Sequence, residues 1–172
     1  MFTEAWNKYY KDIPMLGWKL RESKPDIWFR IHSLPESKRY PESKNEEKIL
    51  LSRHNEIAQA TLGSTTKLFL YWHWIESFHG IEGTKTSEYR EEDFESTLYS
   101  SKAQPWQAGI FDEVILAVAN DELSQIIFLN PENGSIYAPY DGGADIFVIN
   151  QDHCKALKSQ YSKWVSELES GL

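Results

Sequence analysis

The sequence has 172 residues, 41% of them hydrophobic and 14% aromatic, which is enough apolar material for one folded domain over residues 1–172 and too little length for two ordinary domains. Its net charge of −8 is unevenly distributed, since residues 1–54 carry +3 and residues 55–172 carry −11. Such an acidic protein is poorly suited to bind phosphate groups, which disfavours nucleic acid as a partner. There is no apolar run long enough to span a membrane, and the lone Cys154 cannot form an internal disulfide, so we expect a protein of the bacterial cytoplasm.

The first part of the chain predicts two helices and two strands. Phe2–Tyr10 spaces its aromatic residues as a helix does, and residues 26–34 alternate apolar and polar side chains as a strand with one buried face does. Ser43, followed three residues later by a glutamate, predicts the start of a helix that Gly63 can end. Residues 67–75 are dense in aromatic side chains and predict a central strand.

The middle of the chain is less regular. Residues 76–107 show little periodicity, so we expect a long surface loop with at most a short strand at 97–99. Asp112 is a predicted N-cap, and the apolar residues of segment 111–121 recur at helical spacing. The same Val and Ile residues also fit a buried strand, and both alternatives remain open.

A β-hairpin is predicted from residues 125–130 and 135–140, which flank a P-E-N-G turn. Pro139 indicates that the second strand lies at an edge or carries a bulge. Gly142 and Gly143 are expected to adopt positive φ in a turn that leads to a further antiparallel strand at 146–149.

Residues 151–169 predict a C-terminal amphipathic helix, capped by Asn150 or Asp152. Its apolar stripe is expected to pack on the sheet and comprises Cys154, Leu157, Tyr161, Trp164, Val165 and Leu168. Taken together, the elements predict an α+β fold with a mainly antiparallel sheet, helices packed on it, and the amphipathic helix at the C-terminal end.

An acidic run in the middle of the chain is a candidate partner-binding surface. It comprises Glu88, Glu91, Glu92, Asp93 and Glu95. A charge run of this kind is either a solvated loop or a patch for a basic protein, since complementary electrostatic fields speed encounter and select partners.

Two further groups of residues are candidates for binding. The first follows the predicted strand at 26–34 and comprises Arg30, His32, Lys38, Arg39 and Tyr40. Its cationic side chains could bind an anion or an acidic partner, and an exposed loop is the other interpretation. The second group surrounds the double-glycine turn and comprises Tyr140, Asp141 and Asp145, where aspartates also commonly bond their own backbone.

The sequence contains no familiar catalytic or metal-binding motif. The five histidines never recur at the spacing of a metal site, and we predict neither a metal nor a cofactor. Cys154 lies on the apolar stripe of the last helix and is expected to be a core residue, because burial suppresses the reactive thiolate.

Residues 127–164 read I-F-L-N, then I-Y-A-P-Y-D-G-G-A-D-I-F, then a helix with L-x-x-x-Y-x-x-W. This segment resembles an uncharacterised bacterial domain family that carries a C-terminal Y-D-D-R-G-x-D turn between strands, followed by a helix with a Tyr and a Trp. Gly142 and Gly143 stand where that pattern has Asp and Arg. The organisation is also similar to that of the immunity proteins of bacterial toxin systems.

We therefore expect a non-enzymatic immunity protein that binds and neutralises a cognate toxin, basic and nuclease-like. The acidic balance favours this role because nucleases bind phosphates and are often basic. The alternative is a small hydrolase or nucleotide-modifying enzyme with a site assembled around Arg30, His32, Arg39, Asp141 and Asp145.

Overall fold

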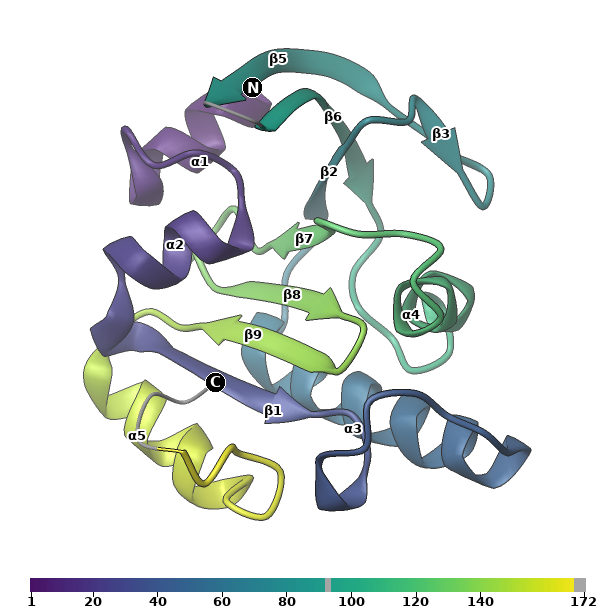
Figure 1. Ribbon diagram of the computed structural model, residues 1–172. Helices are drawn as coiled ribbons and strands as arrows, with labels where there is room; N and C mark the ends of the chain where they lie inside the picture. The colour runs from purple at the N-terminus through teal and green to yellow at the C-terminus, as the bar shows by residue number, and fades with distance from the viewer. Residues whose placement is uncertain (92–93, 169–172) are drawn as a thin grey trace.

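The computed structural model describes residues 1–91 and 94–168. Within these residues, the middle of the molecule is a seven-stranded antiparallel sheet in the order β1-β9-β8-β7-β2-β6-β5 (Figure 1). Its strands, in chain order, are β1 (Trp28–His32), β2 (Leu68–His73), β5 (Thr84–Glu91), β6 (Phe94–Ala103), β7 (Ile127–Leu129), β8 (Ile136–Tyr140) and β9 (Gly143–Phe147). A short separate ladder pairs β3 (Ser77–Phe78) with β4 (Ile81–Glu82).

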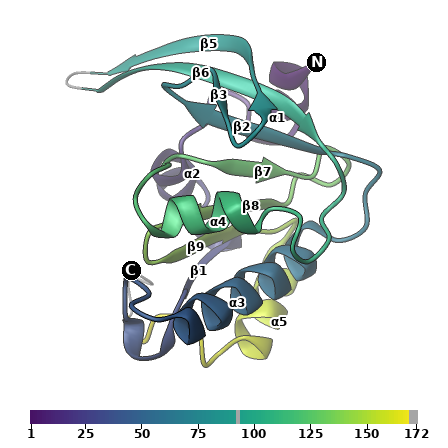
Figure 2. The ribbon, with the colours of Figure 1, turned by 90° about the vertical axis from the view of Figure 1, so that its right-hand side faces the viewer.

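Helices cover both faces of the sheet, so the predicted α+β architecture is confirmed. One face carries α3 (Lys44–Leu62), α4 (Asp112–Ala119) and α5 (Gln151–Gln160); the other carries α1 (Phe2–Tyr10) and α2 (Gly17–Ser23). Figure 2 shows α3 and α4 in front of the strands, with α1 and α2 behind them. Short 3-10 turns precede and follow β1, at Pro25–Ile27 and Pro35–Ser37. Among the helices of residues 1–91 and 94–168, none is both long and apolar enough to cross a membrane.

Strand β2 is the centre of the core, as its composition predicts. All six of its residues are buried. Leu70 and Trp72 pack towards α3 and α4, whereas Phe69 and Tyr71 pack towards α1. A strand that is buried on both faces needs large apolar side chains at consecutive positions, which explains the dense aromatic run.

Helix α3 begins and ends where its sequence predicts. The Ser43 side chain accepts a hydrogen bond from the backbone N–H of Glu46 at 3.2 Å, and Gly63 ends the helix with a φ of 63°. The Glu46 carboxylate reaches back one residue further than a standard capping box, to the backbone N–H of Glu42 at 2.7 Å.

The prediction of a surface loop over 76–107 is wrong, because this region contains the two longest strands. Strand β5 is the edge of the sheet and exposes residues on both faces, so it lacks the apolar alternation of a half-buried strand. Strand β6 does alternate, but two of its buried positions are Ser96 and Ser100. Polar residues at buried positions conceal the period of the strand from a hydrophobicity pattern.

Two details around α4 and β8 also differ from expectation. Of the two alternatives for segment 111–121, the helix is correct. The predicted N-cap is wrong, because Phe111 occupies that position and the Asp112 carboxylate accepts a hydrogen bond from the Asn55 side chain at 2.7 Å. Strand β8 is neither an edge nor bulged, since it pairs with β7 and β9. Pro139 is accommodated because β7 pairs only with Ile136 and Tyr137, which leaves Pro139 without a partner on that side.

The double glycine has a different role from the predicted one. Neither Gly142 nor Gly143 adopts positive φ, and strand β9 begins at Gly143 and ends at Phe147, earlier than predicted. A Cβ atom on Gly143 would lie 1.9 Å from the backbone oxygen of Ile31. Glycine is required there because the backbone of the neighbouring strand β1 lies too close for a Cβ atom, and not because of a turn.

The last helix is capped by Asn150 as predicted, but it ends at Gln160 instead of 169. Cys154, Leu157 and Tyr161 are buried, while Trp164 is only partly buried and Leu168 is 64% exposed. Beyond the helix the chain runs beside β1, where Trp164 O accepts a hydrogen bond from the His32 N–H at 2.7 Å. Trp164 and Val165 still pack against the core, partly buried, although they lie beyond the helix, and only Leu168 of the predicted stripe is exposed.

Candidate functional site

The predicted binding residues Arg30 and Asp145 meet across neighbouring strands. They are directly opposed in the register of β1 and β9. The Arg30 Nε and Nη2 atoms donate to the two carboxylate oxygens at 2.9 and 3.0 Å, and Trp28 Nε1 donates to the same carboxylate at 2.9 Å. Burial lowers the pKa of Arg30, but the hydrogen bonds and the charge of Asp145 outweigh it and raise the pKa overall. Arg30 therefore stays fully charged.

Tyr140 completes this group. The Arg30 guanidinium lies 4.3 Å from the centre of the Tyr140 ring, within the range of a cation–π contact. Burial raises the pKa of Tyr140 against the opposing effect of Arg30, so the hydroxyl remains protonated. The three residues form one partly open cluster on the face of the sheet that α2 covers.

The other residues of the two predicted groups lie in separate places. Arg39 and Tyr40 both donate to the Asp141 carboxylate, from Nε at 2.7 Å and from the hydroxyl at 3.0 Å. Lys38 donates to Glu46 and Glu42 at 2.7 and 2.9 Å, which fixes it against the start of α3. His32 lines a different hollow, with Pro35 and Val165 among its neighbours. The residues of the predicted enzyme site are thus divided among two ion pairs and a separate histidine.

The described residues of the acidic run lie on β5 and β6 and are each paired with a cation. Glu88 accepts from Lys85 at 2.6 Å and Glu91 from Lys19 at 2.8 Å. Glu95 pairs with Arg90. The two remaining members of the run, Glu92 and Asp93, lie outside the described residues. All of these pairs are exposed, so each is held weakly and can exchange its partner.

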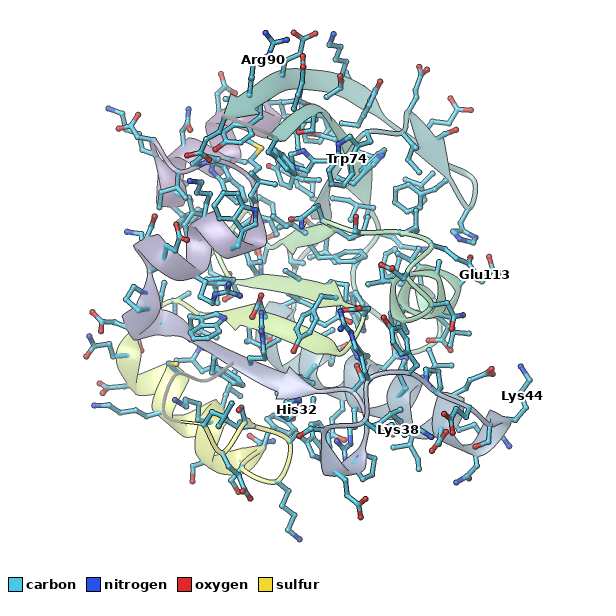
Figure 3. All side chains as sticks on the ribbon, viewed as in Figure 1. His32, Lys38, Lys44, Trp74, Arg90 and Glu113 are labelled. Carbon is cyan, nitrogen blue, oxygen red and sulfur yellow. The ribbon has the colours of Figure 1, made fainter. Side chains whose placement is uncertain are left out.

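An exposed aromatic surface beside these glutamates was not predicted from the sequence. Trp74 and Ile75, directly after β2, are 45% and 43% exposed. The Trp74 ring packs edge-on against Phe94 at a centroid distance of 5.5 Å. Figure 3 shows Trp74 between Arg90 and Glu113, on the side of the molecule that faces the viewer. We call the group Trp74, Ile75, Phe94, Glu88 and Glu95 the Trp74 surface.

Backbone hydrogen bonds hold the Trp74 surface in place. Trp74 has a φ of 73°, and its N–H donates to Thr97 O at 2.9 Å. The buried Trp72 donates from Nε1 to Ile75 O at 2.6 Å. The backbone that carries Trp74 and Ile75 is thus fixed before any partner arrives, which lowers the entropic cost of binding.

A hollow of about 240 Å³ adjoins the Trp74 ring and is lined by Trp74, Glu88, Glu95, Ser96 and Thr97. Its lining thus combines one aromatic residue with two glutamates. An aromatic face with adjacent carboxylates attracts a cationic side chain through both cation–π and ionic contacts. The chemistry of this hollow suits a lysine or arginine of a basic partner.

A buried histidine forms the second polar group of interest. The His54 ring nitrogens lie 2.7 Å from the Ser33 hydroxyl and 2.6 Å from the Tyr137 hydroxyl. All three residues are at most 1% exposed, and burial, aided by Arg53, lowers the pKa of His54 to about 3. The group resembles a nucleophile and base in connectivity, but it is sealed from solvent and joins α3 to β1 and β8.

Residues 1–91 and 94–168 contain no group of three or more His, Cys, Asp or Glu side chains arranged to hold a metal ion. Cys154 is buried, as its position on the apolar stripe predicts, and burial raises the pKa of its thiol. A raised pKa keeps the thiol protonated and unreactive.

Comparison with curated proteins and with solved structures finds no match. A family model described as a domain of unknown function matches residues 16–169, which is most of the chain. The resemblance to an uncharacterised domain family is therefore confirmed at that level. The chain belongs to the family of the domain of unknown function DUF3885.

Proposed function

We propose that this protein is an immunity protein that binds a basic, nuclease-like toxin and blocks it, and that the toxin docks on the Trp74 surface. The observation that carries the proposal is the pair of exposed side chains Trp74 and Ile75, on a backbone held by hydrogen bonds, beside two glutamates. Interfaces concentrate their binding energy in such aromatic anchors, surrounded by polar residues.

Charge supports the same partner chemistry. The protein has a net charge of −8, so it attracts a basic protein at long range. A lysine or arginine of that protein, placed in the hollow beside Trp74, replaces Lys85 or Arg90 as the partner of Glu88 or Glu95. This exchange costs little because exposed ion pairs each contribute less than about 1 kcal/mol.

The test measures toxin inhibition and binding kinetics with the product of the adjacent gene. Trp74→Gly should raise the dissociation rate and weaken binding by about 2 kcal/mol, roughly thirtyfold in Kd. Glycine is chosen because it tolerates the φ of 73° at this position, so the variant keeps its fold. Ile149→Ala is the matched control, since Ile149 is 52% exposed and lies outside the Trp74 surface.

The charge contribution is tested separately. Reversing Glu88 and Glu95 to Lys should lower the association rate, and the wild-type rate should fall as salt rises. The proposal of an immunity function is wrong if the adjacent product does not bind. If it binds and both Trp74→Gly and the reversal leave the kinetics unchanged, the docking surface is wrong.

A further inference from the structure

A second pocket lies between α2 and the sheet, and it shares no residue with the Trp74 surface. It has a volume of about 200 Å³. Its polar wall is formed by Arg21 of α2, Arg30 of β1, Tyr140 of β8 and Asp145 of β9, and its apolar wall includes Trp18, Ile127 and Pro139.

The pocket holds two guanidinium groups and one carboxylate. Asp145 already accepts two hydrogen bonds from Arg30 and one from Trp28. Arg21 Nη1 lies 3.7 Å from the same carboxylate, too far for a hydrogen bond, and its guanidinium otherwise lies 5.7 Å from the Trp28 ring. Within the described residues, Arg21 donates no side-chain hydrogen bond, and neither does Arg30 Nη1. One positive charge and several N–H donors are therefore left over.

Size limits what these donors can bind. A volume of 200 Å³ corresponds to roughly seven water molecules at about 30 Å³ each. This is too small for a nucleotide and sufficient for a compact oxyanion with a short apolar group. Guanidinium groups bind carboxylates and phosphates in the same way, through paired N–H donors.

We propose that this pocket is a binding site for a small oxyanion, a phosphate or a carboxylate, held between Arg21 and Arg30. The anion takes the free donors of both arginines and supplies the negative charge that Asp145 alone does not. The ring of Trp18 and the side chains of Ile127 and Pro139 enclose the remainder of the ligand. The inference is independent of the toxin-binding proposal.

The experiment follows binding of inorganic phosphate and of acetate, separately, against chloride at equal ionic strength. Chemical shifts of the arginine side-chain N–H groups and isothermal titration calorimetry report the binding. Each probe that binds should saturate and should shift the signals of Arg21 and Arg30. Saturation by phosphate alone identifies a phosphate site, and saturation by acetate alone identifies a carboxylate site. Saturation by both probes shows that the pocket accepts either kind of oxyanion.

Two variants of α2 separate the pocket from general charge effects. Arg21→Met should weaken binding at least about tenfold with little loss of stability, because Arg21 is partly exposed and makes no hydrogen bond to Asp145. Lys19→Met removes the same charge from the same helix, but Lys19 does not line the pocket: its ammonium pairs with Glu91 and lies over the Trp18 ring, which the methionine side chain can still cover, so binding should be unchanged. The proposal is overturned if neither anion saturates, or if the two variants weaken binding equally.

Discussion

Replacing Gly143 with Ala should strongly destabilise the protein, although it adds a single methyl group. The added Cβ would lie 1.9 Å from Ile31 O, about 1.5 Å short of ordinary contact, and the obstructing atom is backbone that cannot rotate away. Strand β1 must therefore move from β9 by a large part of that distance. Such a shift breaks the hydrogen bonds nearest to it, among them the bond from Ser33 N–H to Gly142 O.

The expected cost follows from these contacts. Two broken hydrogen bonds at about 1 kcal/mol each, with overpacking of at least about 1 kcal/mol, give a loss of about 3 kcal/mol. In a protein of this size that corresponds to a decrease in Tm of roughly 6–12 °C. Urea denaturation and calorimetry measure both quantities.

Gly17→Ala provides the matched control. Its Cβ would meet only Asp145 Oδ2 at 3.9 Å, and Gly17 lies in a helix without positive φ. This variant should be neutral or more stable by up to about 1 kcal/mol. Equal stability of the Gly143→Ala and Gly17→Ala variants would refute the argument from close strand approach.

Two further predictions concern the core. Because the pKa of His54 is lowered to about 3 in the folded protein, its contribution is fully present above pH 6.5 and is lost as pH falls towards 3. Unfolding free energy should decrease by up to about 1.4 kcal/mol per pH unit below 6.5, and a His54→Gln variant should lack this part of the slope in urea titrations. Leu157→Ala should lower the free energy of unfolding by about 2–5 kcal/mol, and Leu168→Ala by less than about 0.5 kcal/mol, since only Leu157 is buried. Equal losses in chemical denaturation would instead support the predicted stripe that continues to Leu168.

The candidate sites were accessible to sequence reasoning only in part. Arg30, Tyr140 and Asp145 could be selected one by one as charged and aromatic residues near strands and turns. Their convergence depends on the register that opposes Arg30 to Asp145, and Arg21 joins them only because α2 packs on this face. Trp74 could not be recognised as a surface residue from the sequence. A tryptophan in an aromatic run resembles a core residue, and the sequence does not show that β2 ends one residue before it.

The sequence by itself determined the elements whose signals are local. The start of α3 at Ser43, its end at Gly63, the start of α5 at Asn150 and the central position of β2 each follow from a few neighbouring side chains. Capping hydrogen bonds and consecutive apolar residues act within one or two helical turns or a single strand, so they can be read without knowing the fold.

Only the tertiary structure decided the features that depend on distant partners. Strand β5 is polar on both faces and is a strand because β6 supplies its hydrogen bonds. Gly143 is glycine because the neighbouring strand β1, more than 100 residues earlier in the chain, lies too close for a Cβ atom. Helix α5 ends at Gln160 because the chain beyond it pairs with β1 instead of continuing its apolar stripe. In each case the stabilising contact joins residues far apart in the chain, and no local pattern records it.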